Sequence, residues 1–188
     1  MYKIIAICGE AGSGKDRLLQ EVIKIDQEGF NPIFNPIISC TTRPKRDNEI
    51  EGKNYFYLTD SEFQNKINNN EMLEYTEFRN WYYGTCLSVL QKDKINIGVF
   101  NPEGIEKLRF DPRVELIVYR VAAAARTRLM RQLKREYSPD IDEIFRRYKT
   151  DEIVFSNLDF DYITLPNETE NDLVRAAAKI AFSSDKLD

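Results

Sequence analysis

The chain contains no histidine and only three cysteines among its 188 residues. The cysteines, Cys8, Cys40 and Cys86, lie far apart and form no Cys-x-x-Cys pair. Structural zinc sites draw on closely spaced Cys and His ligands, and Ser-His-Asp catalysis needs an imidazole. The sequence therefore argues against both kinds of site, and its scattered cysteines favour a reducing, cytoplasmic setting.

Long hydrophobic runs and an excess of basic charge are also missing. No apolar segment approaches the roughly 20 residues that a membrane-spanning helix needs, and the N-terminus enters an apolar strand pattern without the features of a secretion signal. The formal net charge of −4 exerts no general attraction on nucleic acid or anionic membranes, so we expect neither as a partner. A chain with 42% hydrophobic and 31% charged residues is typical of a soluble globular domain.

Strand and helix patterns alternate along the chain. Apolar or β-branched runs predict strands at 2–8, 34–40, 55–58, 72–78, 95–100, 114–119 and 162–165, with 95–100 and 114–119 as central strands. Helices are predicted from residue 15, at 60–67, 87–90, 103–110, 122–135 and 141–155, and around 173–180, with 183–188 fraying at the end. This alternation predicts an α/β fold with a mostly parallel central sheet.

A glycine-rich loop, GEAGSGKD, joins the first predicted strand to the first predicted helix. Backbone N–H groups of such a loop can cradle a polyphosphate, while the helix N-terminus and Lys15 add positive charge. The bland alternative is a glycine turn with a solvated Lys15. We expect a bound nucleoside triphosphate, held by Gly9, Glu10, Ala11, Gly12, Ser13, Gly14, Lys15 and Asp16.

Asp16 stands where the loop pattern usually has a serine or threonine whose hydroxyl ligates Mg²⁺. A carboxylate can also hold Mg²⁺, directly or through water, although it adds negative charge beside the phosphates. Asp16 is therefore the candidate metal ligand.

Residues 36–91 depart from the alternating rhythm and hold short strands dense in aromatic and charged residues. We interpret them as an insertion that binds a ligand. The arginine-rich segment 126–150, with a break at 138–140, is predicted to be helical. Residues 1–35, 92–125 and 151–188 then form the three-layer P-loop core of a single domain.

The inserted segment carries two motifs, SCTTRPKRDNEIEGKNY at 39–55 and EYTEFRNWYYGT at 74–85. In both, the chain resembles the guanylate kinase family, whose pattern is S-x-T-T-R-x-x-R-x-x-E-x-x-G-x-x-Y followed by a glutamate and, nine residues later, Y-G-[ST]. The resemblance covers the phosphate loop, the inserted segment and, more weakly, the arginine-rich helical segment. It implies that 36–91 is a small mixed α/β subdomain that binds the acceptor nucleotide and that 126–150 is a helical lid.

The resemblance implies roles for the inserted residues. The 5′-phosphate of an acceptor nucleotide is expected to contact Arg43, Arg46, Tyr55 and Tyr83, and forked guanidiniums suit a phosphate dianion. The guanine base is expected to contact Glu74 through N1 and N2, and Ser39 and Thr85 through O6 and N7. The alternatives are a solvated basic turn, a solvated glutamate and core aromatics; Trp81 and Tyr82 are assigned to the core.

The lid arginines Arg131, Arg135 and Arg147 are spaced like those that close over the triphosphate in the family. Phosphoryl transfer needs positive charge around the transferring group. The candidate catalytic residues are thus Lys15, Arg43, Arg131, Arg135 and Arg147. An ordinary charged helix face, or a nucleic-acid contact, is the alternative for the lid. Asn167 is assigned to the adenine side from its position alone.

Three departures from the family accompany these matches: Asp16, the segment Asp47-Asn48-Glu49 in place of Pro-Gly-Glu, and Val99 and Asn101 in the places of two aspartates. Asn101 keeps hydrogen-bonding capacity without charge, and we count it among the substrate-binding residues. A Gly-Lys-Asp ending also resembles phage-type deoxynucleoside monophosphate kinases, which leaves a relaxed or deoxy-preferring specificity open.

The sequence therefore predicts an ATP-dependent kinase that converts GMP or dGMP to the diphosphate with Mg²⁺. Three alternatives stay open: a related binding module for phosphorylated or peptide ligands without kinase activity, a broader deoxynucleoside monophosphate kinase, and a nucleotide-binding regulator. Either a monomer or a homodimer is compatible with the sequence.

Overall fold

The computed structural model describes residues 1–47, 49–135 and 139–182. Asn48, Ser138 and the predicted fraying segment 183–188 lie outside this part of the chain. The strands are β1 (Tyr2–Cys8), β2 (Phe34–Pro36), β3 (Cys40–Thr41), β4 (Phe56–Tyr57), β5 (Met72–Phe78), β6 (Trp81–Cys86), β7 (Ile95–Val99), β8 (Val114–Ala122) and β9 (Ile163–Pro166). The helices are α1 (Lys15–Glu28), α2 (Asp60–Asn68), α3 (Pro102–Arg109), α4 (Ala125–Arg135), α5 (Ile141–Ser156) and α6 (Glu170–Phe182), with a 3₁₀ turn at Leu87–Val89.

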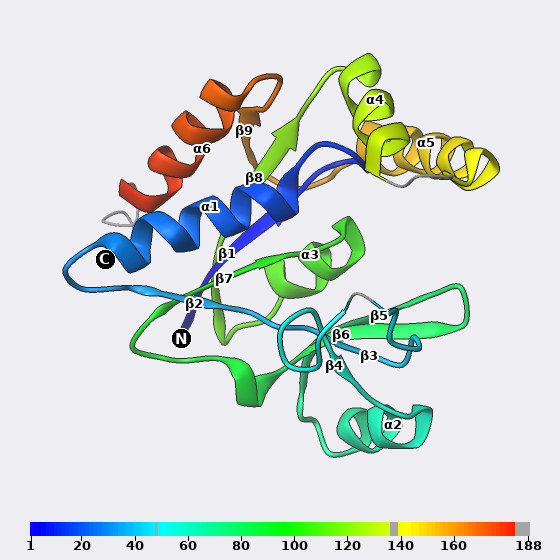
Figure 1. Cartoon of the computed structure of the whole chain (residues 1–188). Coiled ribbons are helices and arrows are strands. Elements are labelled where there is room, and N and C mark those ends of the chain that lie inside the picture. Colours follow the sequence, from blue (N-terminus) through cyan, green and yellow to red (C-terminus); the bar gives the residue numbers. More distant parts are fainter. Residues whose placement is uncertain (48, 136–138, 183–188) are drawn as a thin grey trace.

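The central sheet has the order β2-β7-β1-β8-β9, and all its pairings are parallel. Successive β1 side chains point to opposite faces: Ile5 and Ile7 pack with α1 and α6, whereas Ile4 and Ala6 pack with α3. Burial on both faces explains why β1 is an unbroken apolar run. Figure 1 shows the resulting three layers, with α1 and α6 on one face and α3 on the other. The predicted α/β fold is confirmed.

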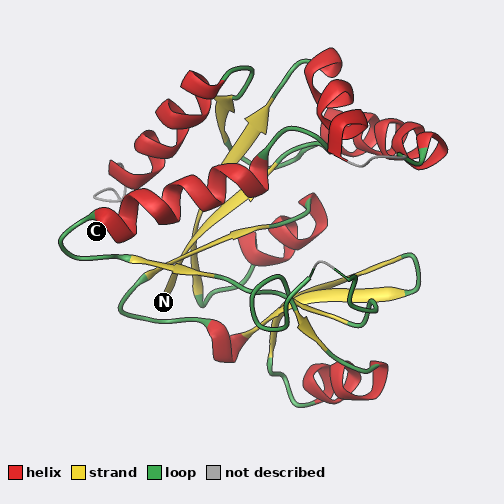
Figure 2. Cartoon of the chain, viewed as in Figure 1, coloured by secondary structure: helices red, strands yellow, loops and turns green. Residues whose placement is uncertain are grey.

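A second sheet of mixed direction has the order β4-β3-β6-β5. Helix α2 packs on it through the fully buried Phe63, in a separate small core with Cys40, Met72 and Cys86. The sulfur atoms of Cys40 and Cys86 are 2.7 Å apart, a contact that their separation in sequence did not reveal. Thr59 caps α2 in a reciprocal capping box with Glu62. Figure 2 shows this sheet apart from the central one, joined to it by loops.

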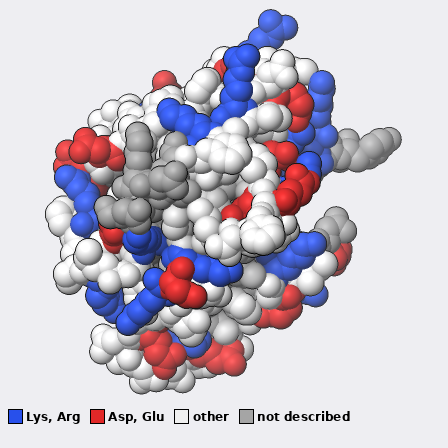
Figure 3. Space-filling view, turned by 90° about the vertical axis from the view of Figure 1, so that its left-hand side faces the viewer, with Lys and Arg blue, Asp and Glu red and all other residues white. Residues whose placement is uncertain are grey.

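Helices α4 and α5 stand out from the core on the side towards which the β5–β6 hairpin points (Figure 1). Helix α4 buries none of its residues, and α5 buries only Ile144 and Phe155. This pair is therefore held mainly by polar contacts, in contrast with the packed core helices. On the face shown in Figure 3, cationic and anionic side chains are intermixed. None of the described helices is both long and apolar enough to cross a membrane.

The extended segment 34–40 is interrupted at Pro36, with β2 before it in the central sheet and β3 after it in the second sheet. Three details differ from the sequence-based prediction. The segment 81–86, which we had not predicted to be a strand, is β6. The predicted helix at 87–90 is a single 3₁₀ turn. Strand β8 runs to Ala122, and α4 begins at Ala125, because Val121 is fully buried in the sheet.

Candidate nucleotide site

The glycine-rich loop connects β1 to α1 in the conformation that a phosphate cradle requires. Gly12 and Gly14 have φ values of 79° and 92°, which are in the left-handed region that favours glycine. A Cβ on Gly12 would lie 2.5 Å from the backbone oxygen of Arg128, and one on Gly14 would lie 2.4 Å from Nδ2 of Asn167. Lys15 follows as the first residue of α1. The loop is thus closely packed on one side, and any larger residue at these positions would displace it.

Contacts from distant segments hold the loop in place. The Arg131 guanidinium on α4 donates to the carbonyls of Gly12 (3.3 Å), Ser13 (3.1 Å) and Asn167 (2.9 Å). The buried Asn167 side chain donates to the Ser13 carbonyl at 2.7 Å. Both predicted residues therefore lie at the loop, on its carbonyl side. In this geometry Arg131 buttresses the loop, in addition to any contact with a bound phosphate.

Asp151 on α5 is a residue of this region that sequence reasoning missed. Its Oδ2 accepts from the Ala11 N–H at 2.6 Å, so a carboxylate takes one of the loop donors expected to bind phosphate. Burial raises the pKa of Asp151, while the Ala11 N–H and the charge of Lys15 act in the opposite direction. A single aspartate on a charged helix carries no sequence signal that would have singled it out.

A cavity of about 500 Å³ opens beside the loop. Its lining includes Gly12, Gly14, Lys15 and Asp16 from the loop and α1, and Arg131, Arg135 and Arg147 from α4 and α5. The structure therefore brings the predicted loop residues and all three predicted lid arginines around one cavity. We call it the donor cavity.

A second cavity of about 460 Å³ lies between the loop and the second sheet. Four of the predicted base and phosphate contacts line it, namely Ser39, Tyr55, Glu74 and Tyr83, together with Asn101. We call it the acceptor cavity. Gly9, Ala11 and Lys15 line its opposite wall.

Glu74 is 7% exposed, and its Oε1 accepts from the hydroxyl of the fully buried Thr85 at 2.8 Å. Burial raises the pKa of Glu74 to about 7, although the Thr85 hydrogen bond acts against this. A buried carboxylate with so few donors is poised to accept further hydrogen bonds from a ligand. Thr85 therefore orients Glu74 and does not itself line the cavity.

Arg43 and Arg46, the two arginines predicted to bind the acceptor phosphate, differ from each other in burial and in their contacts. Arg43 is 6% exposed, pairs with Glu49 at 2.7 Å and lies over the rings of Tyr55 and Tyr57. Its guanidinium holds the pKa of Glu49 at about 2. The exposed Arg46 contacts Glu49 only through its backbone N–H, at 2.9 Å. Of the two arginines predicted to act together on one phosphate, Arg43 is thus paired with an internal carboxylate, and Arg46 meets that carboxylate through its backbone.

Asn101 is the N-cap of α3: its Oδ1 accepts from the Gly104 N–H at 2.7 Å, and its Nδ2 donates to Thr76 at 3.0 Å. Its side chain thus ties the central sheet to β5 as well as lining the acceptor cavity. The neighbouring Val99 also lines this cavity and brings no polar group to it.

The two cavities meet at Ala11, Lys15 and Arg147, which line both. Lys15 and Arg147 therefore stand between a donor and an acceptor, which is where positive charge would assist transfer of an anionic group.

The protein supplies only some of the ligands that a metal ion at this site would need. Among the described residues there is no group of three or more His, Cys, Asp or Glu side chains that could hold a metal ion. Asp16 supplies one carboxylate at the donor cavity. This arrangement suits Mg²⁺, which commonly binds one or two carboxylates together with substrate phosphates and water.

Comparisons with known proteins identify the family and the fold. The family model for guanylate kinase matches residues 1–181. A guanylate kinase of Thermotoga maritima is 31% identical over 188 residues, which cover 96% of this chain and 86% of that protein. A guanylate kinase of Wigglesworthia glossinidia brevipalpis is 31% identical over 96% of this chain and 87% of its own length. The crystal structure of a guanylate kinase from Anaplasma phagocytophilum has the same fold, with a TM-score of 0.63 at 20% identity over 99% of this chain and 86% of that one.

Proposed function

The chain belongs to the guanylate kinase family of nucleoside monophosphate kinases, and we propose that it transfers the γ-phosphoryl group of ATP to GMP or dGMP. The observation that carries the proposal is the junction of two cavities at Lys15 and Arg147, one beside the glycine-rich loop and one beside Glu74. A kinase of this type must hold two anionic nucleotides with their phosphates in line. Two cavities that share cationic walls meet this requirement.

ATP binds in the donor cavity on this proposal. The N-terminus of α1 and the loop N–H groups other than those of Ala11 and Ser13, which donate to Asp151 and to the Glu10 carbonyl, face its phosphates. Lys15 contacts the transferring group. Asp16 holds Mg²⁺ with the phosphate oxygens. When bound, the ion neutralises charge on the β- and γ-phosphates. Arg135 and Arg147 add positive charge from the lid, and Arg131 keeps the loop in shape through its carbonyl contacts.

GMP or dGMP binds in the acceptor cavity on this proposal. Guanine presents N1–H and N2–H₂ donors, which an ionised Glu74 accepts, whereas adenine offers no donor at the equivalent ring position. Ser39 contacts the base edge, and Tyr55 and Tyr83 contact the 5′-phosphate. For Arg43 and Arg46 to reach that phosphate, Arg43 must exchange Glu49 for the ligand.

The transfer step needs no covalent intermediate on the protein. An oxygen of the acceptor phosphate attacks the γ-phosphorus of ATP, and the bond from that phosphorus to the bridging oxygen breaks, so that ADP leaves. Lys15 and Arg147 stabilise the negative charge on the phosphoryl group as it moves from one nucleotide to the other. Closure of the segments 36–91 and 126–150 over the core, which we include in the proposal, excludes water as a competing acceptor. ATP and GMP are cytoplasmic metabolites, and the three buried free thiols suit the same compartment.

A direct assay tests the proposal. The purified chain is incubated with Mg·ATP and each ribo- and deoxynucleoside monophosphate in turn, and ADP formation is followed. We expect turnover with GMP, dGMP or both that exceeds turnover with AMP by at least about 100-fold. The proposal would be refuted if none of the monophosphates led to ADP formation, or if guanine and adenine nucleotides reacted at equal rates. The ratio of GMP to dGMP rates reports the sugar preference directly.

A further inference from the structure

The hairpin between β5 and β6 ends in a two-residue turn. Phe78 and Trp81 pair across it, and Arg79 and Asn80 lie in left-handed backbone conformations with φ of 55° and 62°. Positive φ at both central positions indicates a type I′ turn, which favours Asn or Gly. Asn80 satisfies that preference, whereas the turn gives no reason for an arginine at position 79.

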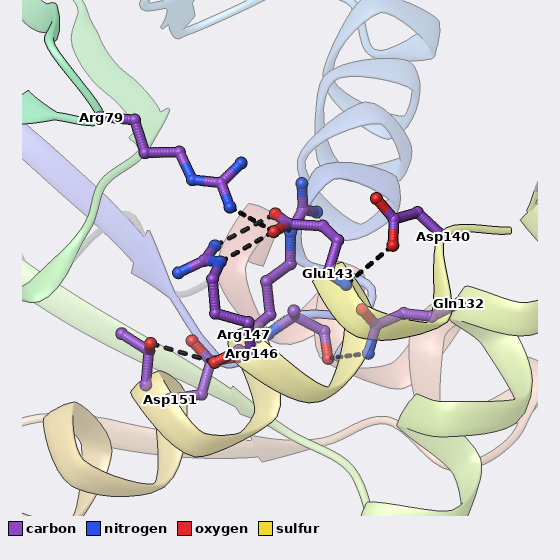
Figure 4. Close-up of polar contacts among 9 residues, drawn as sticks. Arg79, Gln132, Asp140, Glu143, Arg146, Arg147 and Asp151 are labelled. Carbon is purple, nitrogen blue, oxygen red and sulfur yellow. Dashed lines mark hydrogen bonds and ion pairs between the residues drawn. The ribbon is translucent and has the colours of Figure 1, made fainter.

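The reason lies in what the Arg79 side chain contacts. Its Nη2 forms an ion pair with Glu143 on α5, 64 residues later in the chain. Oε2 of the same carboxylate accepts from Arg146 Nε at 2.7 Å, and Oε1 accepts from Arg147 Nε at 2.7 Å. Figure 4 shows Arg79 reaching from the hairpin to this carboxylate, with Arg146 and Arg147 beside it. We refer to these four residues as the Glu143 cluster.

The hairpin tip makes a second contact with the same helix turn. The Arg146 guanidinium lies over the Phe78 ring, 5.5 Å from its centroid. Two neighbouring residues of the tip, Phe78 and Arg79, therefore contact α5 through an aromatic ring and a charge. In this way the second sheet, which carries Glu74 and Tyr83, is joined directly to the helix that carries Arg147.

The cluster carries more positive charge than its carboxylate neutralises, because three guanidiniums share one Glu143. Arg146 and Arg147 hold the pKa of Glu143 at about 2, so the carboxylate stays ionised. The cluster also lies at both cavities: Glu143 lines the donor cavity, Arg146 the acceptor cavity and Arg147 both. A bound phosphate can accept from the guanidinium N–H groups that Glu143 leaves free.

We propose that Glu143 is a positioning residue and that its ion pair with Arg79 couples occupancy of the acceptor cavity to the placement of Arg147 over the donor phosphates. An acceptor that fixes the β5–β6 hairpin fixes Arg79, and Arg79 fixes α5 through Glu143. The effect must be reciprocal: each nucleotide then binds more tightly in the presence of the other. The inference rests on the proposed function and deepens it.

The test measures this coupling by calorimetry. The Kd of a non-hydrolysable Mg·ATP analogue is determined with and without saturating GMP, and the ratio of the two values is the coupling factor. We expect a factor on the order of 10 in the unaltered chain. In Arg79→Ala and in Glu143→Gln it should fall to about 1–2, and the double variant should match the single ones because both remove one contact. The Kd of GMP alone should stay within about twofold in Arg79→Ala.

Two further variants separate coupling from a merely structural role. Arg79→Lys keeps the charge and should restore much of the factor. Arg113→Ala removes an arginine that pairs with Asp111 on an unrelated surface and should leave the factor unchanged. The inference is overturned if the coupling factor is unchanged in Arg79→Ala, or if the losses of coupling in the double variant are additive. It is also overturned if the unaltered chain phosphorylates GMP but shows no coupling between the two nucleotides. An unaltered chain without turnover refutes the proposed function itself, which the first assay reveals.

Discussion

The acceptor side and the donor side of the site are built in different ways. On the acceptor side, Glu74 and Thr85, and likewise Arg43 and Glu49, are partners within 11 and 6 residues of each other in the chain. On the donor side, the loop at 9–16 is held by Arg131, Asp151 and Asn167, which lie 118 to 154 residues away. Short-range pairs form one half of the site, and contacts between distant segments form the other.

The two halves of the site therefore differ in what holds their geometry. The acceptor groups are buried in one small sheet, so their geometry is fixed as soon as that sheet forms. The donor loop depends on α4 and α5, which bury few residues. We therefore expect substitutions on the acceptor side to change stability or base choice, and substitutions on the donor side to change nucleotide affinity and rate.

The largest effect should follow from Lys15→Ala. Lys15 lines both cavities, and its loss removes a full positive charge from beside the transferring group. We expect kcat to fall by about 10²–10³-fold with little change in melting temperature. Steady-state kinetics measure the first quantity and differential scanning calorimetry the second. Lys24→Ala, on the exposed side of the same helix, is the matched control, and an equal loss in both variants would contradict the assignment.

On the acceptor side, Glu49→Gln should mainly affect stability. Arg43 is buried, and without Glu49 its charge is left unpaired. The pKa of Glu49 is lowered from 4.5 to about 2, which corresponds to about 3 kcal/mol of stabilisation of the folded state. Because the folded-state pKa is depressed, this contribution is present above pH 4.5 and is lost as the pH falls towards 2.

Urea unfolding at several pH values measures this contribution. The difference in unfolding free energy between the unaltered chain and Glu49→Gln should be about 3 kcal/mol at pH 7 and should shrink below pH 4.5. Glu51→Gln, an exposed neighbour in the same segment, should show little of this pH dependence. A difference that does not vary with pH would mean that Glu49 stabilises the fold by packing rather than by charge.

Glu74 allows a test of base choice on the same side. Burial raises its pKa to about 7, and only the ionised form accepts from both guanine donors. GMP affinity should therefore rise as the pH increases through 7, by up to about tenfold per unit below it. Glu74→Gln should flatten this profile and lower the preference for GMP over AMP by about 100-fold. A profile that persists in Glu74→Gln would assign the titration to another group.

The contrast between short-range and long-range contacts also explains which parts of the molecule could be predicted from the sequence. The apolar run of β1 and the glycines after it fix the central sheet and the loop, because each pattern is local. The acceptor motifs likewise place Ser39, Tyr55, Glu74 and Tyr83 at one cavity. Strand β6 was missed because Trp81 and Tyr82 were assigned to a core without regard to the pairing of their segment with β5. The core assignment itself holds for Tyr82, which stacks on Phe63 in the small core of the second sheet.

The donor side shows the limit of such reasoning. Arg131, Arg135 and Arg147 were identified only as arginines of suitable spacing. The different partners of Arg131 and Arg147 depend on how α4 and α5 pack against the loop. Glu143 and Asp151 were not identified at all, since one carboxylate among many on a helix has no local signature. Whether the lid arginines contact phosphate, and whether 36–91 and 126–150 move as units, stays a prediction.

Asp151 gives the smallest expected effect and the sharpest contrast with Glu49. Both carboxylates occupy a group that a nucleotide phosphate is expected to bind, but Glu49 neutralises a buried arginine, whereas Asp151 takes a backbone N–H and brings negative charge to the loop. Asp151→Asn keeps an acceptor for the Ala11 N–H and removes the charge. The Kd of Mg·ATP should therefore fall by about fivefold to tenfold, because repulsion between two anions at close range is relieved.

Isothermal titration calorimetry measures this Kd, with Glu152→Gln, an exposed neighbour, as the control. Weaker binding of Mg·ATP in Asp151→Asn would instead mean that the carboxylate shapes the loop for phosphate, and that the two halves of the site are organised by internal anions in the same way.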